Sequence, residues 1–227
     1  MKIDYWQTLH EKAFYHVYNR TNGDALLFAN QENHSYFMRQ WHKYLGNYVD
    51  TIAYCLMSNH FHFVVRVKCV DEYFIACVQN ENTTAAQAFL QHKISVNGFL
   101  EDQFKRFFSS YAKSFNKQQS RHGSLFEPSF KRVQLISHAH LMAKIAYVHH
   151  NPLHHKASKT YGAWVYSSYN TYLSDKPTRV KRTDGLRLFH PDTGVESFIV
   201  YHDEYHKRWL SHRPDLYFND EMDTPEP

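Results

Sequence analysis

The stretch from Ala53 to Val67 constrains the fold more than any other part of this sequence. Its apolar residues fall into two runs separated by the polar pair Ser58-Asn59, whose residue types favour a tight turn. This pattern predicts a β-hairpin over residues 49–68.

Past the predicted turn, the side chains alternate between two faces of a strand. Phe61, Phe63, Val65 and Val67 share one face, which belongs in a hydrophobic core. The other face carries His60, His62, Val64 and Arg66. His60 and His62 would then stand roughly 6–7 Å apart at Cα. Two such imidazoles can bind one divalent metal ion if further ligands come from elsewhere in the chain.

The histidine pair is not decisive by itself. With 18 histidines in 227 residues, about one or two His-x-His patterns are expected by chance. A second pattern, His138/His140, is indeed present. Two histidines on a hydrated sheet face are therefore an alternative interpretation.

Composition narrows the class of protein. The chain has 17 Phe, 17 Tyr and 4 Trp but only 7 Gly and 7 Pro, which argues against extensive disorder. No apolar run reaches the roughly 18 residues of a membrane helix, and the first residues are too polar for a signal peptide. The three cysteines form no CxxC pattern. We therefore expect a cytoplasmic protein with reduced thiols and no membrane partner.

Charge is distributed unevenly along the chain. Residues 93–182 contain 15 Lys and Arg against 4 Asp and Glu, whereas the rest contains 11 against 18. A basic region rich in Phe and Tyr suits nucleic acid, because cations neutralise phosphates and rings stack on unpaired bases. The alternative is a solvated basic helix face.

The order of predicted elements indicates the fold class. Helix-like spacing, alternation and turn signals predict a strand at 12–20, a helix at 31–46, the hairpin at 49–68, two helical pieces within 83–120 that separate near Asn97-Gly98, a strand at 130–136 and a helix at 138–150. Ser137 would cap the last helix, and Asn151-Pro152 would end it. This order predicts an α+β, ferredoxin-like split βαβ fold, an antiparallel sheet with helices on one face.

The pattern weakens beyond about residue 155. We expect one domain over residues 1–155 and a mainly helical or irregular C-terminal extension over 156–227. The extension would contain a basic, linker-like run at 176–182, a small helical appendage within 185–210 and an acidic tail from Asp215.

Tyr147 and Asn151 form a second candidate constellation. They lie four residues apart on the predicted helix and so share one face. Asn151 can supply a carbonyl oxygen to a hard metal, and Tyr147 can supply a phenolic oxygen beside it, although a neutral phenol is a weak nucleophile without activation. The alternative is that Tyr147 packs and Asn151 caps the helix.

Four separated motifs resemble those of a known family. They are Asn59-His60-Phe61-His62 after Ala-Tyr-Cys-Leu-Met, then residues 123–132 (GSLFEPSFKR), residues 147–152 (YVHHNP) and residues 164–169 (WVYSSY). In this order and spacing they resemble the REP-associated tyrosine transposases, a branch of the single-tyrosine HUH transposases. The resemblance covers about residues 12–172. Three positions depart from the family pattern: Ser58 stands where proline is common, Glu127-Pro128 where a polar-basic pair is common, and His150 where an aliphatic residue is common.

The resemblance implies a metal-dependent enzyme that cuts and rejoins single-stranded, hairpin-bearing DNA through a 5′-phosphotyrosine intermediate. It implies that His60, His62 and Asn151 bind Mg²⁺ or Mn²⁺ and that Tyr147 is the nucleophile. Tyr111 is a weaker rival nucleophile, because Phe115 stands where an amide ligand would be needed. None of the three departures removes a catalytic group.

The basic region supplies candidate DNA contacts. Expected phosphate contacts are Lys105, Arg106, Lys113, Lys117, Arg121, Lys131 and Arg132. An alternative function is a hairpin-binding protein that no longer cleaves DNA, and a third is a hydrolase of small phosphates in which water attacks. The sequence leaves open a monomer or a homodimer.

Overall fold

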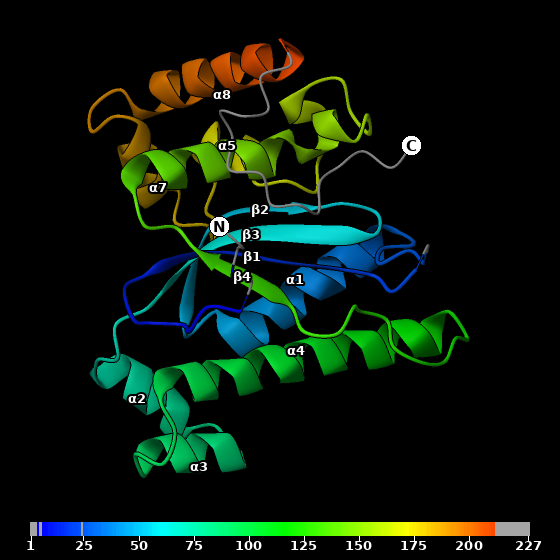
Figure 1. The fold of residues 1–227 in the computed structure, drawn as a ribbon, viewed down its shortest axis with the longest axis vertical. Coiled ribbons are helices and arrows are strands. Elements are labelled where there is room, and N and C mark those ends of the chain that lie inside the picture. Colours follow the sequence, from blue (N-terminus) through cyan, green and yellow to red (C-terminus); the bar gives the residue numbers. More distant parts are fainter. Residues whose placement is uncertain (1–3, 5, 24, 212–227) are drawn as a thin grey trace.

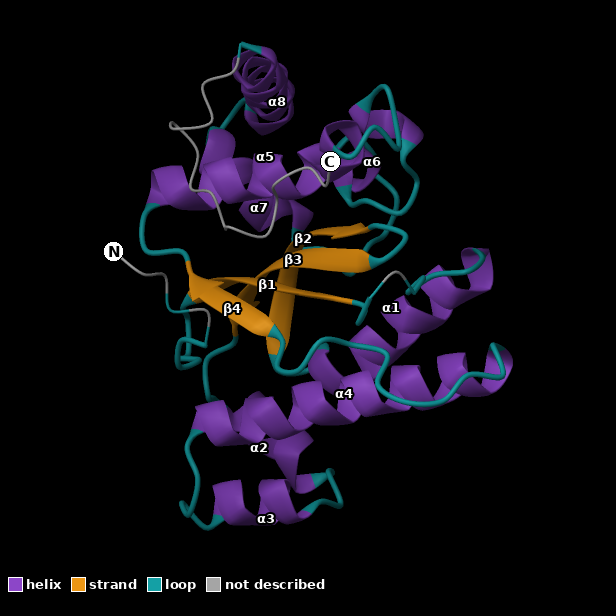
Figure 2. Ribbon diagram, turned by 45° about the vertical axis from the view of Figure 1, so that its right-hand side comes forward, coloured by secondary structure: helices purple, strands orange, loops and turns teal. Residues whose placement is uncertain are grey.

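The structure is a computed structural model that describes residues 4, 6–23 and 25–211. Its core is a four-stranded antiparallel sheet (Figures 1 and 2). Its strands are β1 (Phe14–Arg20), β2 (Val49–Leu56), β3 (His60–Val67) and β4 (Lys131–Gln134). The helices are α1 (Gln31–Leu45), α2 (Glu72–Gln79), α3 (Thr84–Leu90), α4 (Val96–Gln118), α5 (His138–His154), η1 (Tyr161–Ala163), α6 (Tyr169–Tyr172), α7 (Arg182–Phe189) and α8 (Gly194–Leu210).

The sheet confirms the predicted fold class. Its strand order is β2-β3-β1-β4, and the chain runs β1-α1-β2-β3 and then through α4 to β4, as in a split βαβ unit. β2 and β3 form the predicted hairpin, closed by a hydrogen bond from Met57 N to His60 O (2.9 Å). The β-branched and aromatic residues of both strands suit a sheet with two covered faces.

The alternation of β3 assigns its residues to two separate cores. Phe61 and Phe63 pack against α1 and α4, where the Trp41 indole stacks on the Phe63 ring at 3.8 Å. Val64, one residue further on, belongs to a second cluster together with Ile145 and Val148 of α5. The expectation of helices on one face therefore holds for α1 and α4, whereas α5 covers the opposite face (Figure 1). Val64, Ile52 and Cys55 make that second face apolar enough to need a cover.

Several predicted helix boundaries are wrong. α4 begins before Asn97-Gly98, because Ser95 caps it by accepting a hydrogen bond from Gly98 N. α2 has no counterpart among the predicted elements. α5 continues through Asn151-Pro152 to His154. A proline near a helix end removes only one backbone hydrogen bond, and the bond from His155 N to Asn151 O (2.9 Å) keeps the last turn closed.

Residues after 155 pack along the outer edge of β2. Leu56 N donates to Tyr166 O (3.0 Å), Ser168 N to Tyr54 O (2.9 Å) and Lys181 N to Thr51 O (2.8 Å). These bonds cover an edge strand that would otherwise expose unpaired backbone groups. The run at 176–182 is therefore held against the sheet at Lys181 instead of forming a free linker.

The C-terminal helices complete the second face. α7 contacts β2 and α5, and α8 lies on the side of α5 that faces away from the sheet (Figure 1). The domain boundary at residue 155 stays a prediction, and the acidic tail from Asp215 lies outside the described residues. Within the described ranges, no helix combines the length and apolar character needed to cross a membrane.

Candidate active site

His60 and His62 lie on the face of β3 that α5 covers, as the alternation predicts. Their rings are 5.2 Å apart at the centroids. His62 Nδ1 is 2.9 Å from His16 Nε2, and His60 Nδ1 is 2.7 Å from Asn59 Oδ1. Each ring is thus held through Nδ1, which leaves Nε2 as the available nitrogen.

Tyr147 and Asn151 approach the histidines from α5. Ser137 begins this helix by accepting a hydrogen bond from His140 N (3.1 Å). The Tyr147 ring meets the His62 ring edge-on, with 5.5 Å between centroids. Asn151 Nδ2 donates to the Tyr147 carbonyl oxygen (3.0 Å), which fixes the amide and leaves its oxygen as an acceptor. The strand and the helix therefore bring all four predicted residues together.

Four buried polar atoms of this site have no hydrogen-bond partner among the described residues. They are His60 Nε2, His62 Nε2, Tyr147 Oη and Asn151 Oδ1. Leaving a buried polar atom unpaired costs about 1–3 kcal/mol, so such a group needs a physical reason. Two imidazole nitrogens and an amide oxygen are suitable ligands for Mg²⁺ or Mn²⁺, with waters or substrate oxygens filling the remaining positions. The donor set therefore fits a divalent ion.

A metal at this site would depend on Asn151. Within the described part of the chain, no group of three or more His, Cys, Asp or Glu side chains is arranged to hold a metal ion. The third protein ligand would thus be the amide oxygen.

Burial keeps both histidines neutral, which is the form that binds metals. Burial, followed by the nearby His155, lowers the pKa of His60 to about 3. Burial, followed by His16, lowers the pKa of His62 well below its ordinary value. The nearby Asn151 amide acts in the opposite direction and raises the pKa of His60. Asn151 Oδ1 and His60 Nε2 nevertheless form no hydrogen bond with each other.

Two residues of the site were missed in the sequence. His16 on β1 is fully buried, and its ring stacks on His62 with 5.1 Å between centroids. Lys144 on α5 is buried as well, and its Nζ lies 4.4 Å from the centroid of the Tyr147 ring. Strand alternation in residues 14–20 could have placed His16 on the histidine face, and helical spacing could have placed Lys144 beside Tyr147.

Tyr111, the rival nucleophile, lies on the other side of the sheet. It is fully buried between α1 and α4, and its hydroxyl donates to Leu27 O (2.6 Å). It cannot reach the histidine pair.

Six of the seven expected DNA-binding residues separate into two groups. Lys105, Lys113 and Lys117 are exposed on α4. The three arginines instead bind protein groups. Arg106 pairs with Glu81 (2.8 Å), Arg121 donates to Asn116 Oδ1 (3.0 Å), and the buried Arg132 pairs with Glu101 and donates to Gln7 O (2.6 Å).

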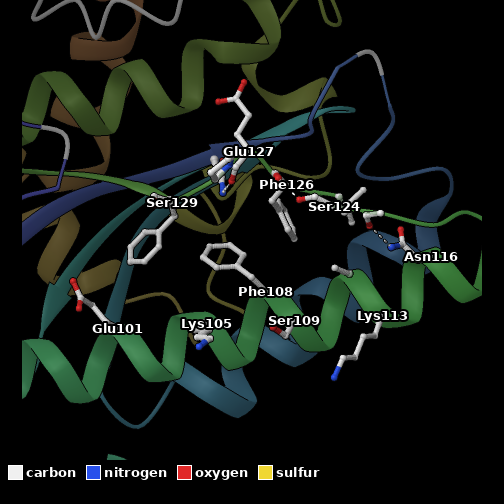
Figure 3. A pocket seen from close by; sticks show the side chains of 16 residues that line it. Glu101, Lys105, Phe108, Ser109, Lys113, Asn116, Ser124, Phe126, Glu127 and Ser129 are labelled. Carbon is white, nitrogen blue, oxygen red and sulfur yellow. Dashed lines mark hydrogen bonds between the residues drawn. The ribbon is translucent and has the colours of Figure 1, made fainter.

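Lys105 and Lys113 line a cleft of about 530 Å³ between α4 and the loop at 123–130. Figure 3 shows the rings of Phe108 and Phe126 in this cleft, whereas Glu127 points away from α4. The cleft lies at the same end of the sheet as the histidines, because Glu127 N donates to Arg20 O (3.0 Å) and Arg20 pairs with His60 across β1 and β3.

Lys131 reaches the site from a different element. It pairs with Tyr18 across β4 and β1, and its Nζ lies 5.9 Å from the Tyr18 ring centroid. The Tyr18 ring in turn stacks on His62 with 5.6 Å between centroids. Lys131 is therefore the expected DNA contact on the histidine face of the sheet.

Comparison with known proteins gives one informative match. No family model matches the sequence, and no curated protein is significantly similar to it. A solved structure of a REP-associated tyrosine transposase bound to a REP hairpin superimposes with a TM-score of 0.50 at 11% sequence identity. The match covers 78% of this chain and 89% of that chain. This chain therefore has the fold of a REP-associated tyrosine transposase.

Proposed function

We propose that this protein is a metal-dependent transposase that cleaves and rejoins single-stranded DNA carrying a hairpin. The observation that carries the proposal is the meeting of four unpartnered polar atoms, from His60, His62, Tyr147 and Asn151, on one face of the sheet. The similar structure supports DNA as substrate, because that protein is bound to a REP hairpin.

His60, His62 and Asn151 would hold Mg²⁺ or Mn²⁺. When bound, the ion would polarise the scissile phosphate and stabilise the charge that develops on it. The protein holds this donor set rigidly. His60 and His62 stand on a central strand, and Asn151 is tied to the backbone of α5. Such rigidity suits a reaction in which phosphate and phenol must keep their alignment.

Tyr147 would act as the nucleophile. Its phenolic oxygen attacks phosphorus and gives its proton to solvent, while the bond from phosphorus to the 3′ oxygen breaks. That oxygen takes up a proton and leaves as a 3′ hydroxyl, and the 5′ phosphate stays on Tyr147. A second 3′ hydroxyl can reverse the exchange and rejoin DNA without ATP, because the phosphodiester bond is conserved. Lys144 brings a positive charge beside the phenol and the incoming phosphate.

Unpaired DNA would approach the site past β4 and α4. Lys131 faces the histidine side of the sheet, and Lys105 and Lys113 border the cleft with Phe108 and Phe126. Cations beside aromatic rings suit single-stranded DNA. Lys117 lies further along the same helix, on the same exposed surface.

The test is to incubate the full chain with a hairpin-bearing oligonucleotide and measure intact mass. With Mg²⁺ or Mn²⁺ we expect a covalent protein–DNA adduct and a released fragment with a 3′ hydroxyl. EDTA should prevent both, and added metal should restore them. Hairpin binding without any cleavage would instead support the non-cleaving alternative.

His16 is expected to position His62 for metal binding. For His62 Nε2 to act as a ligand, its Nδ1–H must donate, and His16 Nε2 is the acceptor at 2.9 Å. Replacing the acceptor of a ligating histidine typically weakens metal binding by roughly 10- to 100-fold. We expect His16→Ala to lose Mn²⁺ affinity by this factor, measured by electron paramagnetic resonance of free Mn²⁺.

The conservative variant His16→Gln separates positioning from packing. Its amide oxygen can accept the same hydrogen bond, so Mn²⁺ affinity should be partly retained. Equal Mn²⁺ affinities in the wild type and both variants would show that His16 does not position His62 for metal binding.

A further inference from the structure

A second basic surface lies at the edge of β2, far from His60 and His62. It is a cleft of about 630 Å³, here named the β2-edge cleft. Its charged lining consists of Arg39, Lys43, Lys68, Arg179 and Lys181 around Asp50. Its segment at 178–181 lies within the run at 176–182 that was expected to be a linker, and the proposed catalytic reaction uses none of the cleft.

Three separate segments build the β2-edge cleft. Arg39 and Lys43 lie four residues apart near the end of α1 and so share one helix face. Lys68 follows β3, where its Nζ donates to Gly46 O (2.8 Å). The segment at 178–181 is held alongside by the hydrogen bond from Lys181 N to Thr51 O (2.8 Å). Tertiary structure thus gathers cations that are distant in sequence.

The cleft carries an excess of positive charge. Asp50, its carboxylate, already pairs with Arg66 (2.7 Å) and lies 3.7 Å from Lys181 Nζ. Among the described residues, no carboxylate forms an ion pair with Arg39, Lys43 or Arg179. These three cations are exposed. Cations near a helix C-terminus complement the helix dipole, but that effect does not account for Arg179 and Lys181, which come from a different segment.

Two partly buried groups of the cleft have lowered pKa values, chiefly because of burial. Burial, and after it Arg179, lowers the pKa of His42 to about 4. Burial is also the largest cause of the lowered pKa of Lys68, which Asp50 opposes and Lys181 reinforces.

The lining indicates which kind of nucleic acid fits. Among its described lining residues the β2-edge cleft contains no Phe, Tyr or Trp, and its one aromatic ring is that of the half-buried His42, so it offers little surface on which an unpaired base could stack. The cleft beside α4, by contrast, contains Phe108, Phe126 and Phe130. A surface with several cations and no Phe, Tyr or Trp ring suits a phosphate backbone whose bases are paired.

We propose that the β2-edge cleft binds the phosphate backbone of the double-stranded hairpin stem, away from the cleavage site. This inference rests on the proposed function, because it assumes a hairpin substrate. His60 begins β3 and Lys68 follows its other end, so the two sites are separated by roughly 25 Å at about 3.3 Å per residue. That length corresponds to about seven base pairs of duplex at 3.4 Å each. One hairpin can thus reach both sites.

The test is the salt dependence of hairpin binding, measured by fluorescence anisotropy with the full chain. In the triple variant Arg39→Gln, Lys43→Gln, Arg179→Gln, the slope of log affinity against log salt should become shallower by about 2.7, since three phosphate contacts are lost and each contributes about 0.9. Affinity for the hairpin at low salt should fall at least tenfold. A matched control with the same loss of charge is Lys159→Gln, Arg187→Gln, Lys207→Gln, at exposed positions outside the cleft.

The outcomes separate the cleft from the catalytic proposal. An unchanged salt slope for hairpin binding would overturn the proposal that the cleft binds the stem. An equal loss of hairpin affinity in the control triple variant would overturn it as well. If the cleft triple variant loses as much affinity for a single strand without a stem as for the hairpin, the cleft binds unpaired DNA and the proposal is also overturned. A wild-type chain that binds the hairpin but forms no phosphotyrosine adduct would instead refute the proposed reaction and leave the salt test of the cleft intact.

Discussion

Replacing Tyr147 by phenylalanine is expected to abolish the covalent protein–DNA adduct without unfolding the protein. Phenylalanine has no oxygen to attack phosphorus, so the adduct should fall by at least about a thousandfold, as when an enzyme loses its nucleophile. The Tyr147 hydroxyl has no hydrogen-bond partner among the described residues, so its removal breaks no such bond. Intact-mass spectrometry measures the adduct, and thermal unfolding checks the fold.

The matched control is Tyr111→Phe, which removes the same atom on the opposite side of the sheet. Tyr111 donates a buried hydrogen bond to Leu27 O (2.6 Å), so this variant should lose about 1–3 kcal/mol of stability. Adduct formation per folded molecule should be unchanged. An adduct that survives in Tyr147→Phe but disappears in Tyr111→Phe would reject our choice of nucleophile.

Short-range patterns in the sequence predicted the parts of the fold that they determine directly. Alternation around Ser58-Asn59 predicted the hairpin and assigned Phe61 and Phe63 to one core and the histidines to the other face. The Ser137 cap of α5 was also predicted, because a hydroxyl that accepts from a backbone N–H three residues later is a local interaction.

The errors arose where tertiary contacts outweigh local preference. Pro152 ordinarily marks the end of a helix, yet α5 continues past it while packed between the sheet and α8. Arg132 is predicted from charge alone as a phosphate contact, but its pairing with Glu101 depends on α4 passing beside β4. No spacing rule brings residues 31 positions apart together.

The candidate site shows the same division. Helical spacing predicted that Tyr147 and Asn151 share a face, but their meeting with His60 and His62 was implied only by resemblance to a family. His16 was overlooked because its role depends on β1 pairing with β3, which sets it beside His62. The buried contact between His149 of α5 and His202 of α8 depends on how the C-terminal region packs against α5. The sequence pattern did not predict that packing.

Acidification is expected to begin to destabilise this protein near pH 6.5, well above the pH range in which carboxylates are protonated. A chain of hydrogen bonds links α8 to β2 through two fully buried histidines. His149 Nδ1 is 2.9 Å from His202 Nε2, and His149 Nε2 is 2.8 Å from Ser168 Oγ. His202 Nδ1 lies 2.7 Å from Phe198 O, which can only accept. His202 therefore donates through Nδ1 and accepts at Nε2 from His149, whose own Nε2 accepts from Ser168.

This arrangement uses every ring proton of two neutral histidines. A proton added at His202 Nε2 would face the Nδ1–H of His149, and one added at His149 Nε2 would force Ser168 to stop donating to it and turn to Tyr54 O (3.3 Å). Burial accordingly lowers the pKa of His202 to about 3, and burial followed by His202 lowers the pKa of His149 well below its ordinary value. In the unfolded chain these histidines have a pKa of about 6.5, so they take up protons at a higher pH than they do in the folded chain. Lowering the pH therefore stabilises the unfolded state relative to the folded state. The stability of the neutral pair is complete above pH 6.5 and is lost progressively toward pH 3.

The expected size follows from linkage. At pH 5, a histidine with a folded pKa of about 3 costs about 2 kcal/mol relative to neutral pH, which is a large share of a typical domain's stability. His60 and His150, each with a pKa lowered to about 3 chiefly by burial, act in the same direction. Urea unfolding at pH 7.5, 6.0 and 5.0 should therefore show a steep fall in the free energy of unfolding.

The variant His202→Gln tests whether the buried pair causes this fall. An amide can accept the hydrogen bond from His149 but cannot take up a proton in this range, so the loss of stability between pH 7.5 and 5.0 should shrink by about 2 kcal/mol. The variant should be less stable than the wild type at pH 7.5, where the original hydrogen bonds are intact. The exposed His122→Gln serves as the control and should leave the pH dependence unchanged. If His202→Gln keeps the wild-type dependence, the acid sensitivity comes from other groups and not from the link between α8 and α5.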